Sequence, residues 1–187
     1  MFRRLMFTSD DVVTIPGVLS PVECKNWIRW AEGEGFDSAP VTTALGPINL
    51  PKVRNNTRVM LDDVEAASEL WGRLLPLLPE ALLAEQPVGL NERFRFYRYD
   101  PGQRFAPHCD GYYARPDGSE VSRLTLLIYL NADCLGGETR LISPVARDVR
   151  PETGSVLIFP HGFCHEGCEV FAGRKYVLRT DVMFRSL

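Results

Sequence analysis

The chain has 187 residues, of which 45% are hydrophobic and 24% are charged, and its formal net charge is −3. This balance is typical of a folded globular protein and excludes a chain that is disordered throughout. The slight acidic excess argues against a nucleic-acid-binding protein, which usually carries surplus Lys and Arg. No apolar run approaches the roughly 18 residues of a membrane helix, so we expect neither nucleic acid nor a membrane among its partners.

The cellular compartment is inferred from the N-terminal segment and the cysteines. Asp10 and Asp11 follow the first arginines before an apolar core of signal-peptide length can form, so we expect no export signal. The five cysteines are an odd number. Together these features predict reduced thiols and a cytoplasmic location.

The first predicted elements are a strand and a capped helix. Residues 12–19 predict a short strand and turn. Ser20, Pro21 and Glu23 then occupy the N-cap, N1 and N3 positions of a helix, which is a capping-box arrangement. The helix is expected to end near residues 33–35, where glycines occur. Its apolar face is formed by Cys24, Trp27, Ile28 and Ala31.

The next stretch, residues 37–58, is predicted to be irregular because it contains three prolines and a polar cluster from Arg54 to Arg58. Such a cluster is usually a solvated loop, although an arginine-rich loop before a core could also close over a site. A second helix is expected over residues 63–75, where apolar residues recur at helical spacing. A short helical piece around 79–85 follows it.

From residue 92 the pattern changes to short strands. Residues 93–99 alternate, with Phe94 and Phe96 on one face and Arg95, Tyr97 and Tyr99 on the other. Further strands are expected at 123–130, 138–142, 155–159 and 175–184. Two helices followed by about eight strands predict a mainly β fold, a double-sheet jelly roll with the helices packed on one sheet. We expect a single domain over residues 1–187, with a helical part of about 1–90 and a jelly-roll core of about 91–187.

Three residues in the strand region have the pattern of a metal site. His108 and Asp110 are one residue apart, so a strand would point both side chains to the same face. His165 lies just past the apolar strand 155–159, where a closed double sheet could bring it to the same point. Two histidines and one carboxylate form the ligand set of non-haem Fe(II) oxygenases. His161, four residues earlier, is an alternative to His165.

A second signal comes from the last predicted strand. Lys175 opens this apolar strand ten residues after His165, and Arg179 follows at i+4 on the same face. Lys175 could simply be a strand-end lysine in water. A cation on an interior face is costly unless an anion meets it, so the pair also looks arranged for a dicarboxylate.

These motifs resemble the catalytic domain of prolyl 4-hydroxylase-type Fe(II)- and 2-oxoglutarate-dependent dioxygenases. The matching segments are YDPGQRFAPHCD (99–110), RLTLLIYLN (123–131), GGET (136–139), and His165 with Lys175 ten residues later. The resemblance covers about residues 92–184 and is weaker over the N-terminal helices, where IPGVLSPVEC is similar to the family's opening segment. It implies a double-stranded β-helix, the jelly roll already expected from the pattern.

The resemblance also implies a role for each matching residue. His108, Asp110 and His165 would bind iron, with His165 preferred over His161 by its spacing to Lys175. Lys175 would pair with the C5 carboxylate of 2-oxoglutarate. The co-substrate pocket would also include Tyr99, which would donate a hydrogen bond, and Tyr129, which would line its wall.

Other residues are candidates for contacts with substrate. Arg179 stands where family members often carry a smaller polar residue, so it is expected either to share the co-substrate carboxylate or to reach toward the prime substrate. Arg95 shares a strand face with the pocket tyrosines. Tyr112 and Tyr113 follow Asp110 in a loop that could cap the pocket, and Arg58 could approach it from the arginine-rich loop. We therefore expect substrate contacts from Arg95, Tyr112, Tyr113 and Arg58.

The implied activity is that of a dioxygenase whose partners are dioxygen and 2-oxoglutarate. It would hydroxylate a prolyl or other amino-acid side chain of a peptide or protein, with ascorbate as a reductant. The alternatives are a small-molecule hydroxylase of the same mechanism, a metal-dependent enzyme without a co-substrate, and a non-catalytic jelly-roll binding module. A structural zinc site at Cys164 and Cys168 fits poorly, because no second pair of ligands follows.

Overall fold

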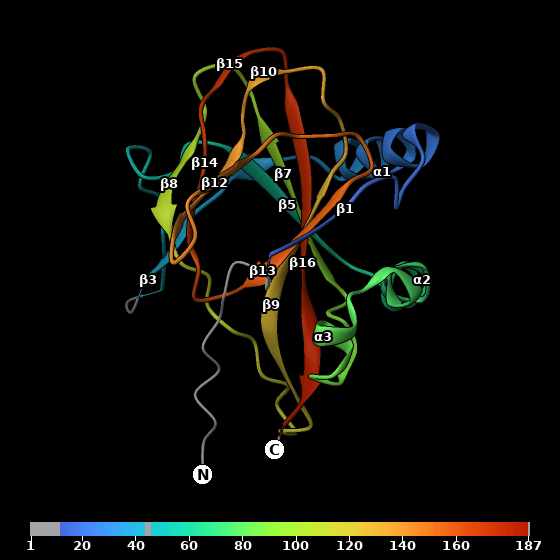
Figure 1. Cartoon of the computed structure of the whole chain (residues 1–187). Coiled ribbons are helices and arrows are strands. Elements are labelled where there is room, and N and C mark those ends of the chain that lie inside the picture. Colours follow the sequence, from blue (N-terminus) through green and yellow to red (C-terminus); the bar gives the residue numbers. More distant parts are fainter. Residues whose placement is uncertain (1–11, 44–45, 187) are drawn as a thin grey trace.

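The computed structural model describes residues 12–43 and 46–186 (Figure 1). The aspartates on which the export prediction rests lie outside the described residues. Antiparallel sheets are the main secondary structure, and the largest has the strand order β1-β13-β9-β16-β7-β5-β2 with β6 paired to β16. The strands of this main sheet are β1 (Val13–Ile15), β2 (Asp37–Ser38), β5 (Thr57–Asp62), β6 (Pro87–Leu90), β7 (Arg93–Tyr99), β9 (Glu120–Tyr129), β13 (Val156–Pro160) and β16 (Lys175–Arg185).

A second sheet of order β12-β11-β14-β8 lies across from part of the main sheet (Figure 1). Its strands are β8 (Phe105–His108), β11 (Thr139–Ser143), β12 (Arg147–Val149) and β14 (Cys164–Gly167). Two small pairs complete the strands, namely β3 (Val41–Thr43) with β4 (Gly46–Ile48) and β10 (Leu135–Gly136) with β15 (Val170–Ala172). The double-sheet jelly roll predicted from the sequence is confirmed.

The helices are α1 (Pro21–Glu34), α2 (Val64–Leu74) and α3 (Glu80–Leu83), with a 3₁₀ turn at Leu75–Leu77. The capping box of α1 is formed as predicted, because the Ser20 hydroxyl accepts from the Glu23 N–H and the Glu23 carboxylate accepts from the Ser20 N–H. Within the described residues, none of the helices is long and apolar enough to span a membrane.

The two faces of β7 contact two different parts of the interior, namely the core beneath the helices and the space between the sheets. Phe94 and Phe96 are buried on the face toward the helices, where the Trp27 ring of α1 lies 5.2 Å from that of Phe94. Tyr97 and Tyr99 are buried on the opposite face. The alternation predicted for residues 93–99 is therefore confirmed, and it directs the tyrosines toward the space between the sheets.

The prediction that residues 37–58 are irregular was wrong. This stretch contains β2, β3 and β4, and it leads into β5, which pairs with β7 from Thr57 to Asp62. The partner strand supplies hydrogen bonds that the local sequence does not reveal, so prolines and polar residues conceal the pairing. The loop before β5 is not solvated throughout, since Arg54 and Asn56 are buried.

Candidate active site

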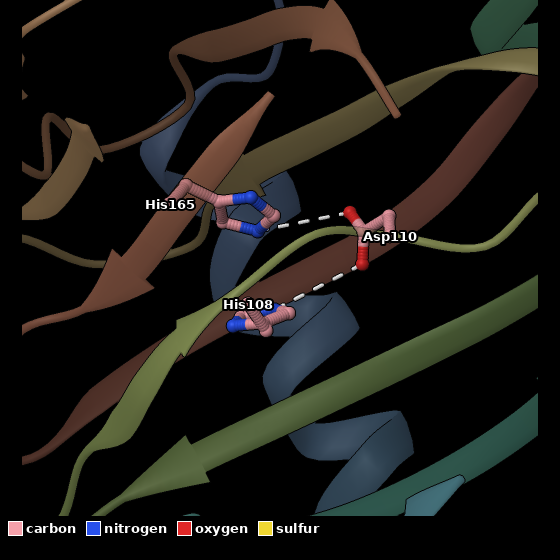
Figure 2. Close-up of side chains that lie close together, drawn as sticks. All are labelled: His108, Asp110 and His165. Carbon is pink, nitrogen blue, oxygen red and sulfur yellow. Dashed lines mark ion pairs between the residues drawn. The ribbon is translucent and has the colours of Figure 1, made fainter. Parts of the chain in front are cut away.

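His108, Asp110 and His165 come together between the sheets (Figure 2). His108 ends β8 and lies directly across from His165 of β14, and Asp110 follows two residues beyond His108. His108 Nε2 is 3.9 Å from Asp110 Oδ1, and His165 Nε2 is 3.7 Å from Asp110 Oδ2. The ligand atoms all lie within 4.8 Å of one another, so one metal ion could contact all three.

Both histidines present Nε2 toward the shared point. Their Nδ1 atoms lie 2.9 Å from the Ala106 carbonyl oxygen and 3.0 Å from the Phe163 carbonyl oxygen, respectively. A carbonyl only accepts, so Nδ1 carries the hydrogen and Nε2 keeps its lone pair. Burial lowers the pKa of His108 to about 4 and also lowers that of His165. Neutral imidazoles are the form that a metal requires, so this pair fits an Fe(II) ion.

Asp110 is held as a carboxylate by two donors. Burial by itself would raise its pKa, but Arg179 and the neighbouring histidine His165 outweigh this effect and lower the pKa to about 2. Arg179 Nη1 donates to Oδ1 over 2.6 Å, and the Thr125 hydroxyl donates to Oδ2 over 2.6 Å. The carboxylate is therefore both ionised and fixed in orientation before any metal binds.

His161 supports this carboxylate through a chain of hydrogen bonds. Since the Thr125 hydroxyl donates to Asp110, it accepts from His161 Nδ1, 2.9 Å away. His161 Nε2 then accepts from the Ser122 hydroxyl over 2.9 Å, and Ser122 accepts from the Tyr113 N–H. Both ring nitrogens of His161 are occupied, and the metal-ligand group found among the described residues contains His165 instead.

Lys175 is buried on the same face of the main sheet. It is 2% exposed, its Nζ donates to the Gly137 carbonyl over 2.6 Å, and the ring centroids of Tyr99 and Tyr129 lie 5.2 and 5.7 Å from Nζ. No described acidic side chain forms an ion pair with it. Burial lowers its pKa to about 8, so most of it remains a cation at neutral pH. A buried cation without an ion-pair partner fits a site for a carboxylate.

Lys175 and the three candidate ligands share one pocket of about 410 Å³, which is partly open to solvent. Its lining residues are Tyr97, Tyr99, Phe105, His108, Asp110, Leu127, Thr139, His165, Gly167, Lys175, Val177 and Arg179. Residues of β16 and β7 form its floor, from Lys175, which lies across from Tyr99, through Val177, which lies across from Tyr97, to Arg179. The pocket therefore runs from the buried lysine past the candidate metal site.

The two cations predicted on β16 both line this pocket, but their head groups have different partners. Arg179 donates to Asp110 and, over 3.2 Å, to Asp181, whereas Lys175 donates to the Gly137 carbonyl. Whether both contact one co-substrate carboxylate stays a prediction.

The structure places the other predicted residues at varying distances from this pocket. Tyr129 lies behind its wall, where its hydroxyl donates to Thr139. Tyr112 is 74% exposed, and neither it nor Tyr113 is among the lining residues. Tyr113 and Arg95 instead line a smaller neighbouring pocket. Arg58 of β5 lies beside the main pocket, directly across from Tyr97.

Thr125 has a role that the sequence reasoning missed. It is fully buried in the apolar strand β9, and its hydroxyl connects His161 to Asp110. The available signal was a single hydroxyl inside the otherwise apolar run LTLLIYL, since a buried polar group needs a hydrogen-bond partner.

The chain is similar to known oxygenases in sequence and fold. Residues 94–180 match the model of the 2OG-Fe(II) oxygenase superfamily. Prolyl 4-hydroxylase 1 of Arabidopsis thaliana is 27% identical over 197 residues, covering 90% of this chain and 67% of the relative.

Two solved structures share the fold. The viral collagen prolyl hydroxylase of Paramecium Bursaria Chlorella virus-1, in its 2OG complex, superposes with a TM-score of 0.66 at 22% identity, covering 94% of this chain and 97% of that one. A Trichoplax adhaerens prolyl hydroxylase, in complex with a peptide fragment of hypoxia inducible factor, gives a TM-score of 0.66 at 17% identity and covers 93% and 84%. These structures show the fold, and the family match over residues 94–180, the sequence relative and the site geometry together support a prolyl 4-hydroxylase-like dioxygenase that depends on Fe(II) and 2-oxoglutarate.

Proposed function

We propose that this dioxygenase hydroxylates a prolyl or other amino-acid side chain of a peptide or protein, with His108, Asp110 and His165 as its iron ligands. The observation that carries the proposal is the convergence of the three ligand atoms within 4.8 Å in a pocket that also contains a buried lysine. When bound, Fe(II) and 2-oxoglutarate supply the oxidising chemistry with dioxygen, which converts the co-substrate to succinate and carbon dioxide and a substrate C–H to C–OH.

Lys175 is proposed to hold the C5 carboxylate of 2-oxoglutarate. Its ammonium group has three donors, and only one is used on the Gly137 carbonyl, so two remain for a carboxylate. Gly137 itself has a φ of +72°, and a Cβ there would lie 3.0 Å from Lys175 Cδ, so a side chain would crowd the lysine. The close approach of this glycine supports the proposed role of the GGET segment.

Two tyrosines complete the proposed co-substrate end of the pocket. The Tyr99 hydroxyl lies beside Gly167, where a Cβ would be 3.3 Å from it, so the glycine leaves room for this hydroxyl. We propose that Tyr99 donates to the co-substrate. Tyr129 packs near Lys175 and is fixed by its bond to Thr139, so its proposed role is to support the wall from behind.

At the metal end, Arg179 and Thr125 are proposed to position Asp110. Each occupies one carboxylate oxygen, which limits rotation of the carboxylate about its Cβ–Cγ bond. Partners of this kind fix ligand orientation in metal sites and are costly to remove. Arg179 is therefore proposed to act mainly through Asp110.

The proposed prime substrate rests on the relatives. The Arabidopsis thaliana relative is a prolyl 4-hydroxylase, and the Trichoplax adhaerens enzyme binds a peptide fragment. The pairing of β5 from the first half of the chain with β7 from the second also supports the proposal that residues 1–187 form one domain.

The test first measures conversion of 2-oxoglutarate to succinate in the absence of a prime substrate, and then screens for the prime substrate. The purified protein, loaded with Fe(II) and 2-oxoglutarate under nitrogen, should form succinate when air is admitted, and omission of iron should abolish this. Proline-containing peptides should then gain one oxygen atom by mass spectrometry. Full iron occupancy without succinate would favour the non-catalytic binding module. Succinate formation with oxygen transfer only to free small molecules would favour the small-molecule hydroxylase.

A further inference from the structure

Four arginines gather on the β5–β7 side of the candidate metal site. They are Arg54, Arg58, Arg95 and Arg179, and the two carboxylates that pair with members of this cluster are Asp110 and Asp181. Four cations against two anions leave two positive charges. The two positive charges of a bound Fe(II) ion would cancel the two negative charges of 2-oxoglutarate. The excess of two positive charges in the arginine cluster would therefore persist in the loaded enzyme.

Arg54 is the most deeply buried member, at 6% exposure. Its guanidinium lies 4.6 Å from the ring centroid of Tyr97 and 4.3 Å from that of Phe105, and both rings line the pocket. Nε donates to Asn56 over 2.8 Å, but the buried Nη2 has no hydrogen-bond partner. A buried guanidinium with an unused donor is costly unless an acceptor reaches it.

Arg58 is half-buried directly across from Tyr97, and within the described part of the chain no ion pair neutralises it. The pKa of Arg58 is lowered. Burial is the largest cause, and the positive charges of Arg54, Arg95 and Arg179 add to this effect. The same field acts on Tyr97, where burial would raise the pKa but Arg179, Arg54 and Arg95 lower it instead. The cluster therefore creates a positive potential at one wall of the pocket.

The cluster extends along β7 away from the co-substrate end, since Arg58 lies across from Tyr97, two residues from Tyr99, and Arg95 lies two residues further. Along β7 and β16, Lys175 pairs with Tyr99, whereas Arg179 pairs with Arg95 four residues further along. Four residues of extended chain span about 13 Å. Lys175 already provides a cation for the C5 carboxylate, so Arg54 and Arg58 are available to another anion.

We infer that Arg54 and Arg58 bind a carboxylate of the prime substrate, which is therefore an acidic molecule: a peptide with an acidic residue beside the hydroxylated one, or an amino-acid derivative with a free carboxylate. This inference rests on the proposed function and adds the substrate's charge to it. Arg95 and Arg179 are occupied by Asp181 and Asp110 and contribute mainly through their field.

The test measures binding of matched probes to the protein loaded with Mn(II) and 2-oxoglutarate, by calorimetry. One arm compares Ac-Ala-Asp-Pro-Ala-NH₂ with its Asn counterpart, and the other compares N-acetylproline with N-acetylprolinamide. The wild type should prefer the acid at least tenfold in one arm, and that arm identifies the source of the carboxylate. Arg58→Gln should reduce the preference to under threefold, and Arg58→Lys should retain most of it.

The control is Arg147→Gln, which removes an equal charge from the exposed strand β12 and should leave the preference unchanged. Equal binding of acid and amide by the wild type, no binding of either acid, or an unchanged preference in Arg58→Gln would overturn the inference. Succinate formation without a prime substrate tests the proposed function separately. If it proceeds normally while the acid preference is absent, only the inference about the substrate fails.

Discussion

Arg179 Nη1 lies 2.6 Å from Asp110 Oδ1, so a partly buried guanidinium holds the carboxylate that is proposed to bind iron. The same guanidinium contacts Asp181, and its Nε has no partner. We expect Arg179→Ala to weaken iron binding by roughly 10- to 100-fold, because the loss of a group that orients a metal ligand typically has this effect. The KM for 2-oxoglutarate at saturating iron should change less than threefold. Competition with a fluorescent chelator measures the iron affinity, and a raised KM with unchanged iron affinity would instead place Arg179 on the co-substrate.

The three candidate ligands and His161 should respond differently to substitution. His108→Ala, Asp110→Ala and His165→Ala should each abolish stoichiometric iron binding while circular dichroism still shows the folded protein. His161→Ala should retain one iron per chain, because both of its ring nitrogens are bonded to hydroxyl groups. Metal analysis after gel filtration distinguishes the four variants. Equal iron loss in His161→Ala and His165→Ala would contradict the proposed ligand set.

The pH dependence of stability should report the two histidines of the candidate metal site. In the metal-free protein the pKa of His108 is lowered from 6.5 to about 4, so between these values the unfolded chain binds more protons than the folded one. Stability should therefore be highest above about pH 6.5 and should fall as the pH drops toward 4. His108 alone would account for about 3 kcal/mol, since one pKa unit corresponds to about 1.4 kcal/mol. Urea unfolding at several pH values tests this, and His108→Gln should flatten the curve in that window.

Sequence patterns predicted the parts of this site that depend on local spacing. The His108-x-Asp110 spacing and the alternation along β7 each follow from the two-residue period of a strand, and both hold in the structure. The partners of Arg179 could not be predicted in the same way. They depend on how β16 aligns with β7 and β9, where Arg179 lies between Arg95 and Leu127.

The burial of Arg54 could not be predicted from the sequence for a related reason. The sequence around it has the composition of a solvated loop, yet an isolated bridge to Phe105 holds it over the pocket wall. Phe105 lies about fifty residues later in the chain. Contacts between segments so far apart are not encoded in local composition, so neither the burial of this arginine nor the strand β5 that follows it could be read from the segment itself.

The five cysteines should all titrate as thiols. In the structure all five are free, and Cys109 and Cys164, which interact with each other, are each adjacent in sequence to a candidate ligand. A thiol reagent added under denaturing conditions without reductant should count five groups per chain. A count of three would show that a pair is oxidised, and peptide mapping would then identify which pair.

Lys175 gives the sharpest test of the co-substrate site. Lys175→Met keeps the length of the side chain and removes its charge, so a bound carboxylate would lose a charge-assisted hydrogen bond worth about 1.5–3 kcal/mol. About 1.4 kcal/mol is a factor of ten, so the KM for 2-oxoglutarate should rise at least tenfold while iron affinity stays within threefold.

The pKa of Lys175 in the free enzyme is about 8, and only the cation binds the carboxylate well. The wild-type KM should therefore rise above pH 8, by up to about tenfold per pH unit. Lys175→Arg should show no such rise, because a guanidinium stays protonated across this range. A flat wild-type profile together with an unchanged KM in Lys175→Met would remove Lys175 from the co-substrate site.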